Sequence, residues 1–575
     1  CAELGAKPPG STAGRTQANR IEQAFRAAGL QTSFEDFHVP RYAIKRVRLA
    51  VDGGPDVPGE TFAYGGTGRV EADVVDVGVG RPADYAGKDV TGKIVMVSRD
   101  EAFHRTSQLA QVIARGGAAM LYVSGSPDNL IQEGTVRFAQ TRPAPVPAVS
   151  VGAEDGAALR ARLANGLAMT IEVDARREDA VARNVLGVRR GTTHPDKIMV
   201  VGGHYDSWHA GAIDNCTAIG SLLSIVNDVK DVPLAYTVVF AGWDAEELGL
   251  VGSYDWVARH ADRIGDVVLN ENLEMTAANA GATALRFGTG SAVMNALVRE
   301  AGTANGYAPT DMPVGVVRAI SGGILPTDIQ PFYSAGVQGF STFTSTPYYH
   351  TPQDVPEHVD RESLRRVSAY LRDALLKLQT ATPAELAVRE VPRVKVTAPA
   401  KADAGAAVPV DIELTDPAGN PIAGAPVRVL VNQNDHWAVA EGTASDLGGG
   451  RYRYTLPAGA TDADRTAITV TAETPAFMAE GYARVDQRQR GLLAAPAPAC
   501  TNQRLHLELA FAPPGAGVIT SLEATVSTGK AVVLANHLVV VDHHGTDASP
   551  VELRLEAKTS SGKTFAQTRS YRACA

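Results

Sequence analysis

Residues 200–252 decide the fold of this chain, and they read VVGGHYDSWHAGAIDNCTAIGSLLSIVNDVKDVPLAYTVVFAGWDAEELGLVG. Apolar runs over residues 197–203 and 235–242 predict two strands, and residues 216–229 between them predict a helix. Alternation of strand and helix is typical of an α/β sheet. In open α/β sheets, functional side chains lie at the ends of the strands. The polar residues that follow these runs are therefore candidates for a site.

These polar residues are the types that bind divalent metal ions. His204 and Asp206 follow the first run, Asp214 lies in a small-residue turn, and Glu246 and Glu247 follow the second run. Two candidates further along the chain, Glu274 and His350, would complete the set. Imidazole and carboxylate oxygens suit zinc, and a carboxylate can bridge two ions. We therefore predict a site for two Zn²⁺ ions.

The predicted roles follow from the side-chain chemistry. Asp214 would bridge the two ions, with His204 and Glu274 on one of them and Glu247 and His350 on the other. Glu246 lies beside a ligand but is not needed as one, so it is the predicted general base that takes a proton from the metal-bound water. Asp206 could hold the second ring nitrogen of His204, as outer carboxylates commonly do.

The motifs HYDSW, GAIDN and WDAEELGLVGS resemble the metallopeptidase family of the secreted bacterial leucyl aminopeptidases. The Ser-Trp after the Asp resembles in particular its branch of glutamate carboxypeptidase II and transferrin receptor. The resemblance implies the same ligands and the same base, and a cis peptide bond between Asp214 and Asn215. PYYHTPQD resembles the final-ligand motif of the family, which gives Tyr349 an oxyanion-stabilising role. One departure is Glu274, since the family usually has Asp in this segment.

Length and composition limit the other possibilities. A chain of 575 residues predicts three or four domains, and a net charge of −9 excludes the basic field that nucleic acid binding needs. No apolar run reaches the ~20 residues of a membrane span. The first residues do not form a signal peptide, so we expect any export signal to be absent from this chain. The expected location is nevertheless secreted or periplasmic, in keeping with the disulfide predicted below.

Four cysteines are present, and only one pair is predicted to be bonded. Cys500 and Cys574 bracket the last β-rich segment, which predicts a disulfide formed in an oxidising compartment. We expect Cys216 to be a small buried helix residue with no partner that would make it a nucleophile, and Cys1 to be incidental.

The predicted organisation is a zinc-peptidase α/β sandwich with a mixed sheet, interrupted by an insertion and followed by β domains. Residues 1–52 and 181–385 are the predicted catalytic domain. Residues 53–180 resemble the protease-associated (PA) domain that many family members insert, although a plain spacer is an alternative. Short alternating runs over 390–487 predict an immunoglobulin-like β-sandwich, and 498–575 predict a second β domain.

The predicted function is hydrolysis of a terminal peptide bond of short peptides. An aminopeptidase is favoured narrowly over a carboxypeptidase of the glutamate carboxypeptidase II type, for which Arg318 is a candidate carboxylate anchor. An alternative of another class is a receptor on an inactive peptidase scaffold. The retention of all metal-competent side chains and of Glu246 favours the enzyme, and also argues against a single-zinc glutaminyl cyclase relative.

Overall fold

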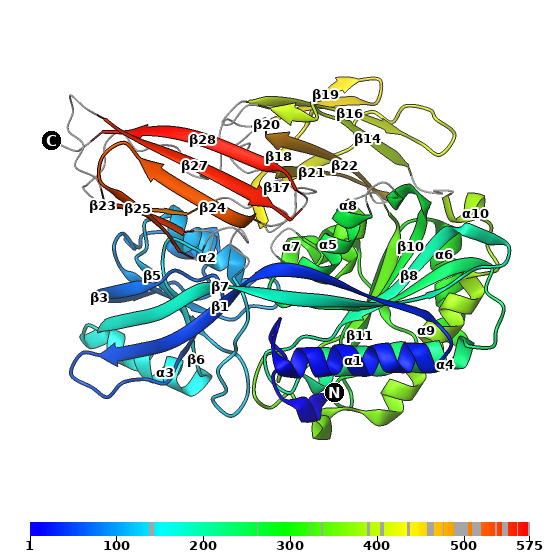
Figure 1. The fold of residues 1–575 in the computed structure, drawn as a ribbon, viewed down its shortest axis with the longest axis horizontal. Coiled ribbons are helices and arrows are strands. Elements are labelled where there is room, and N and C mark those ends of the chain that lie inside the picture. The colour runs from blue at the N-terminus through cyan, green and yellow to red at the C-terminus, as the bar shows by residue number, and fades with distance from the viewer. Residues whose placement is uncertain are drawn as a thin grey trace.

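The structure is a computed structural model, and it describes residues 1–136, 143–260, 263–321, 324–334, 337–387, 392–402, 407–433, 437–456, 465–474, 477–487, 504–508, 519–534, 538–542, 550–560 and 562–572. Within these ranges one 13-stranded sheet occupies the N-terminal two thirds of the chain. Four smaller sheets follow it (Figure 1).

The half of the large sheet that contains the predicted catalytic segment, called the peptidase half below after that prediction, is mixed, as predicted. Its central strands run parallel, and its outer strands pair antiparallel, β11 with β13 and β7 with β9. The strands of this half, in spatial order, are β12 (Thr310–Asp311), β11 (Ala284–Thr289), β13 (Gly339–Thr344), β10 (Val267–Leu273), β8 (His194–His204), β9 (Tyr236–Trp243) and β7 (Ala168–Arg189).

Helices cover both faces of this half. On one face Phe25, Leu222 and Leu371 join one apolar core, and on the other Trp243, Trp256 and Phe332 join a second. The apolar stripes that predicted the first and the closing helices are the buried faces of α1 and α9. The helices are α1 (Thr12–Ala27), α4 (Thr217–Val229), α5 (Val251–Arg259), α6 (Ala292–Ala304), α7 (Val314–Ile320), α8 (Ile329–Ser334), α9 (Arg361–Leu378) and α10 (Pro383–Ala387). The predicted α/β sandwich is confirmed.

The inserted segment continues the same sheet. β7 pairs with β9 through its C-terminal residues and with β3 through its N-terminal residues, so one strand belongs to both halves. β1 (Gln31–Val51) pairs with β7 over nearly its whole length, and the two strands cross the middle of the molecule (Figure 1). The other elements of the insertion are β2 (Glu60–Thr61), β3 (Gly68–Asp76), β4 (Ile94–Ser98), α2 (Arg105–Ala114), β5 (Ala119–Val123), β6 (Ala148–Val151) and α3 (Ala153–Arg162).

The β-rich region after residue 392 forms facing sheets. Val410 and Ile412 of one sheet and Val429 and Val470 of another share one apolar core, because alternate residues of each strand point inward. These two sheets contain β14 (Arg393–Thr397), β15 (Lys401–Ala402), β16 (Val408–Thr415), β17 (Val427–Gln433), β18 (Trp437–Thr443), β19 (Ser445–Gly448), β20 (Arg451–Leu456), β21 (Arg465–Thr474) and β22 (Phe477–Gln487).

A last group of strands forms two three-stranded sheets around a separate core that includes Val539, Val541 and Leu555. They are β23 (Arg504–Glu508), β24 (Ile519–Val526), β25 (Lys530–Leu534), β26 (Leu538–Asp542), β27 (Val551–Thr559) and β28 (Thr564–Tyr571). Strands are thus present in both predicted β regions, whereas the immunoglobulin-like topology stays a prediction.

The cysteines pair differently from the prediction. Cys1 is bonded to Cys216, which precedes α4, so the N-terminal segment is joined covalently to the loop that carries Asp214. The prediction that Cys1 is incidental is therefore wrong. It failed because the two residues are 215 positions apart in sequence, and nothing in the local pattern of either one indicates its partner. Cys500 and Cys574 lie outside the described residues.

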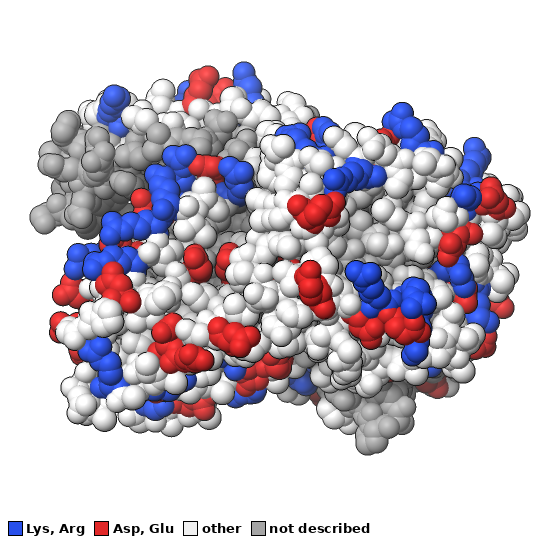
Figure 2. Space-filling view, turned by 90° about the horizontal axis from the view of Figure 1, so that it is seen from below, with Lys and Arg blue, Asp and Glu red and all other residues white. Residues whose placement is uncertain are grey.

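The surface carries charges of both signs. On the face shown in Figure 2, basic and acidic side chains are interspersed, and much of the face between them is uncharged. Among the described residues, no helix combines the length and the apolar character that crossing a membrane would need.

Candidate metal centre

Five chain segments bring the predicted ligands together beside the parallel strands. His204 ends β8, Glu247 lies in the loop after β9, and Glu274 follows the last residue of β10. Asp214 lies in the turn before α4, and His350 lies in the loop after β13. The structure therefore unites five residues that lie far apart in sequence, because parallel strands end at the same edge of a sheet.

Asp214 is the centre of this group. Its Oδ1 lies 3.2 Å from His204 Nε2, and its Oδ2 lies 3.1 Å from His350 Nε2. Glu274 Oε1 lies 3.2 Å from His204 Nε2, and Glu247 Oε2 lies 3.0 Å from His350 Nε2. Two sets of candidate ligands result, and Asp214 belongs to both. The first set is His204, Asp214 and Glu274, and the second is Asp214, Glu247 and His350.

The donor set fits a pair of zinc ions. All five residues are buried, and several of their polar atoms have no hydrogen-bond partner among the described residues. These atoms are Asp214 Oδ1, Glu247 Oε1, Glu274 Oε2 and His350 Nε2. Buried acceptors without donors are costly, and a cation bound between them would remove that cost. Imidazole nitrogen and carboxylate oxygen are also the ligand types that zinc prefers.

The pKa shifts reflect the same crowding. Burial opposes the charged form, yet the adjacent imidazoles of His204 and His350 hold the pKa of Asp214 well below its usual value. Burial raises the pKa of Glu274 to about 7 and that of Glu246 well above its usual range, and repulsion from neighbouring carboxylates adds to both shifts. In the protein without metal, the site therefore holds more carboxyl groups than it can keep ionised.

Asp206 supports the site mainly through the backbone. Its carboxylate accepts hydrogen bonds from the amides of Glu246 (3.1 Å) and Glu247 (3.2 Å). The nearest partner of His204 Nδ1 is the main-chain oxygen of Asp206 at 3.1 Å, while the carboxylate oxygen is 3.4 Å away. Asp206 therefore fixes the Glu-Glu pair and the imidazole together, and the predicted contact to the second ring nitrogen is made chiefly by its carbonyl.

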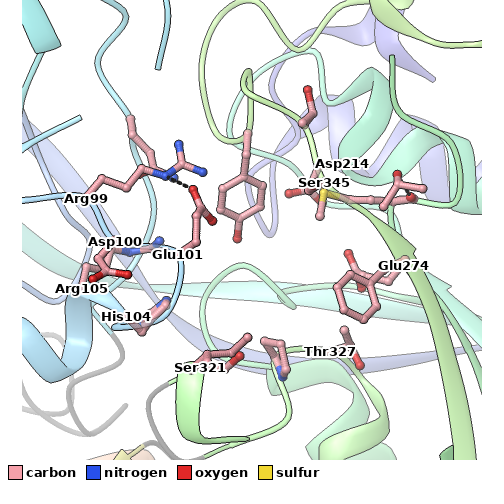
Figure 3. A pocket seen from close by; sticks show the side chains of 18 of the residues that line it. Arg99, Asp100, Glu101, His104, Arg105, Asp214, Glu274, Ser321, Thr327 and Ser345 are labelled. Carbon is pink, nitrogen blue, oxygen red and sulfur yellow. Dashed lines mark hydrogen bonds and ion pairs between the residues drawn. The ribbon is translucent and has the colours of Figure 1, made fainter. Parts of the chain in front are cut away.

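A cavity of about 210 Å³ opens beside the ligands (Figure 3). Glu246, Glu274 and Tyr349 line it from the peptidase half. Tyr349 is stacked on the ring of His350, with the ring centroids 3.7 Å apart, and burial raises the pKa of its hydroxyl, so the hydroxyl keeps its proton. The inserted half contributes the opposite wall with Arg99, Asp100, Glu101, His104, Arg105, Tyr122 and Gln132.

Arg318 does not take part in this cavity. Its side chain is buried on α7, its guanidinium lies 5.9 Å from the ring centroid of Tyr333, and it is not among the lining residues. The prediction that it could meet a substrate carboxylate is not supported by this position. In sequence, a basic residue beside a Gly-rich loop looks like an exposed side chain that could bind a carboxylate. Its burial depends on tertiary packing, which the local sequence does not indicate.

Three supporting residues were not predicted. Asp354 accepts hydrogen bonds from the amides of Ile213 and Asp214, at 2.7 and 3.0 Å. Trp208 donates from Nε1 to Glu247 Oε2 at 2.7 Å. The buried ammonium of Lys7 donates to the carbonyl of Ala210 at 2.9 Å. Asp354 and Trp208 lie inside the motifs PYYHTPQD and HYDSW, so these motifs contained a signal for them, whereas nothing local marks Lys7.

The peptide bond between Asp214 and Asn215 is cis, as the family resemblance implied. Asn215 also donates from its side chain toward the carbonyl of Leu273 at 3.3 Å and accepts from the amide of Met275 at 2.8 Å. These two bonds tie the Asp214 turn to the segment that carries Glu274.

Known proteins share both halves of the large sheet. Residues 184–375 match Peptidase family M28, and residues 70–159 match the PA domain. Aminopeptidase YwaD of Bacillus subtilis is 26% identical over 397 residues, which cover 65% of this chain and 82% of that protein. A glutamate carboxypeptidase 2 homolog of Caenorhabditis briggsae is 37% identical over 105 residues, but these cover only 17% of this chain and 14% of that protein.

The fold also matches a solved structure. The structure of a zinc aminopeptidase from Bacillus subtilis superposes with a TM-score of 0.53 at 22% identity, covering 67% of this chain and 94% of that chain. At this identity the likeness establishes the fold of the peptidase and its insertion. With the sequence matches, it confirms the predicted resemblance: residues 184–375 match Peptidase family M28, and residues 70–159, ahead of them in the chain, match the PA domain.

Proposed function

We propose that this protein is a zinc-dependent aminopeptidase that binds two Zn²⁺ ions and removes the N-terminal residue of short peptides. The enzyme class, a metallo-exopeptidase, follows from the family match and from the aminopeptidase relative. The observation that carries the proposal is the shared Asp214 between two sets of buried ligands, since a single carboxylate that serves both sets is what a pair of ions requires.

The residues around the cavity have separable tasks. His204, Asp214 and Glu274 would hold one ion, and Asp214, Glu247 and His350 the other. When bound, zinc would lower the pKa of water and polarise a carbonyl group. Glu246 faces the cavity without belonging to either ligand set, which supports its role as the base that takes the proton of the attacking water. The protonated hydroxyl of Tyr349 can donate a hydrogen bond to an oxyanion.

The wall contributed by the insertion supports a role of the PA domain in shaping the substrate cavity. Seven of its residues line the cavity, so a peptide that reaches Glu246 also meets the insertion. This is more than a spacer would do. The boundaries of the four domains given above remain predictions, and we expect the C-terminal β domains to bind or orient rather than to catalyse.

One observation favours a second candidate, a carboxypeptidase. Arg105 lines the cavity with its side chain buried, and no ion pair joins it to a carboxylate among the described residues. A guanidinium in this position can accept a substrate carboxylate in a bidentate contact. The local similarity to a glutamate carboxypeptidase homolog is in keeping with this alternative. The grouping of metal-competent side chains beside Glu246 supports an enzyme over an inactive receptor.

We also propose an extracytoplasmic location. The bond between Cys1 and Cys216 supports it, since structural disulfides persist mainly in oxidising compartments.

Metal analysis tests the metal part of the proposal directly. The purified protein, stripped with a chelator and dialysed against zinc, should bind two equivalents and regain hydrolysis of a peptide with a free amine. The His204→Ala and His350→Ala variants should each lose tight binding of one equivalent. Two tight equivalents in either variant would mean that the ligand set is wrong.

A further inference from the structure

The inserted domain reaches past the cavity wall to one of the metal ligands. Residues 132–136, which we call the strap, cross from the PA domain to the loop of His350. We propose that the strap positions the His350 imidazole for zinc, so that this half of the metal centre depends on the inserted domain. The inference rests on the proposed function.

The strap and His350 are joined by two backbone contacts. The amide of Glu133 donates to the carbonyl of His350 at 3.0 Å, and the carbonyl of Glu133 lies 3.3 Å from His350 Nδ1. Because a carbonyl oxygen can only accept, this second contact places the ring proton on Nδ1. Nε2 is then left with its lone pair free, directed at Asp214 and Glu247. This is the tautomer that a zinc ligand needs.

The two histidines of the site obtain this support from different places. His204 Nδ1 contacts the carbonyl of Asp206, two residues further along its own strand-end loop. The corresponding carbonyl for His350 comes from Glu133, 217 positions earlier in the sequence and in the inserted domain. The site of His204 is therefore supported within the peptidase half, and that of His350 across the two halves.

Hydrogen bonds within the PA domain fix the position of the strap. Two backbone hydrogen bonds join it to Ala63, from Ala63 N to Gly134 O at 2.8 Å and from Val136 N to Ala63 O at 3.1 Å. Two side chains of the PA domain add further hydrogen bonds, from Arg105 Nε to Thr135 O at 2.8 Å and from the Tyr122 hydroxyl to Gln132 Oε1 at 3.0 Å. The apolar core of the PA domain also includes Ala245 and Leu248 of the peptidase half. A shared core makes the contact a fixed one, so the position of the Glu133 carbonyl is determined by the fold.

The Glu133 side chain adds a third contact. Its Oε1 lies 3.0 Å from Nε2 of His209, in the loop where the neighbouring Trp208 donates to the ligand Glu247. The strap therefore meets the loop of His350 and also the loop whose Trp208 contacts Glu247, the other acid on the His350 side.

Gly134 permits this close approach. Its φ is +133°, and a Cβ atom there would lie 2.8 Å from His350 Nδ1 and 2.6 Å from Arg105 Nη2. Any side chain at this position would push the strap away from the imidazole. Gly166, also in the inserted segment, has a φ of +79°, and a Cβ atom added to it would meet no other atom within 4 Å. It provides a matched control for the backbone cost alone.

The test compares Gly134→Ala with Gly166→Ala by zinc titration of the full-length protein against a chromophoric chelator. Loss of an outer partner of a metal-bound histidine typically weakens metal binding by about 10- to 100-fold. We expect this loss in Gly134→Ala at one of two sites only, with kcat restored by excess zinc, and wild-type affinity at both sites in Gly166→Ala. Equal affinities in Gly134→Ala and wild type, or equal losses in both variants, would overturn the proposal.

A second pair covers the case in which Gly134→Ala does not fold. Glu133→Ala removes the contact to His209, and Glu154→Ala removes an exposed acid of the same domain. We expect several-fold weaker zinc binding at one site in the first variant only, and unchanged binding in both would contradict the role of the strap. Failure of the wild-type protein to bind zinc would instead remove the proposed function.

Discussion

Asp214 is the residue on which the metal centre depends, because each of its oxygens faces a different imidazole. Its neighbours Glu246, Glu247 and Glu274 are all buried, so the site concentrates negative charge in a medium that disfavours it. The two histidines alone balance only part of that charge. This charge imbalance is the physical reason to expect divalent cations. Glu246 differs from the other acids because it lines the cavity and belongs to neither candidate ligand set.

Replacing the base should separate catalysis from metal binding. Glu246→Gln keeps the size of the side chain but cannot accept a proton, so we expect kcat to fall by about 10²- to 10⁴-fold. Zinc content should stay at the wild-type value, because Glu246 is in neither ligand set. Steady-state kinetics and metal analysis on the same sample check both points, with the exposed Glu300→Gln as control. Retained activity would remove Glu246 as the base.

The unusual ligand Glu274 gives a second prediction at this scale. Its Oε1 reaches His204 Nε2 at 3.2 Å despite the extra methylene, so the glutamate could share an ion with His204. Glu274→Asp should preserve or raise zinc affinity, whereas Glu274→Ala should lose one tight equivalent. Both affinities can be measured by competition with a chelator. An alanine variant with two tight equivalents would show that Glu274 is not a ligand.

The five predicted ligands lie together in the structure, and the sequence indicated this grouping because they lie in motifs at strand ends. It could not predict Lys7 or Glu133, since their contacts depend on segments that are adjacent only after folding. Arg318 illustrates the opposite error, because a polar residue next to a glycine-rich loop indicates nothing about its burial. The chemical type of a residue thus indicated its role only where the strand pattern also predicted its position in the fold.

At the scale of elements, β10 carries an acid that the function does not use. Glu271 is fully buried, both carboxylate oxygens lack hydrogen-bond partners among the described residues, and burial raises its pKa well above the usual value. The folded protein therefore keeps this group protonated at pH values where the unfolded chain ionises it. The unfolded state then binds fewer protons, so Glu271 makes the protein less stable as the pH rises above the unfolded pKa of about 4.3.

Glu271→Gln should remove this dependence, because an amide does not titrate. Each pH unit above the unfolded pKa costs the wild type about 1.4 kcal/mol from this group until the folded pKa is reached. Thermal unfolding between about pH 5 and pH 8 should show a smaller loss of stability with pH in the variant than in the wild type. Identical pH profiles would mean that Glu271 is ionised, or paired, in the folded protein.

The start of α4 gives a further prediction for an element. The bond from Cys1 to Cys216 holds this helix and the Asp214 turn against the N-terminal segment. A disulfide that closes a long loop commonly contributes about 2–4 kcal/mol. Cys216→Ser should therefore lower the Tm, and a reductant should lower the Tm of the wild type by at least as much. A variant as stable as the oxidised wild type would contradict a structural role for this bond.

At the scale of the whole molecule, the sequence separated an α/β region from β-rich regions, and the structure agrees. Periodicity of 3.6 and of 2 residues marks these elements locally, which is why α1, α9 and the strands after residue 392 were predicted. The continuity of one sheet through β7 was not predicted, because strand order is set by long-range pairing. The proposed role of the strap depends on the same continuity, because β7 joins the two halves in one sheet.

The central claim, a zinc aminopeptidase, is tested most directly by hydrolysis of two peptides with and without a chelator. One peptide has a free amine and an amidated C-terminus, and the other an acetylated amine and a free carboxylate. Glu246→Gln serves as the inactive control. We predict chelator-sensitive cleavage of the first peptide only. Cleavage of the second only would establish the carboxypeptidase and give Arg105 its substrate, and cleavage of neither by the zinc-loaded protein would contradict the account.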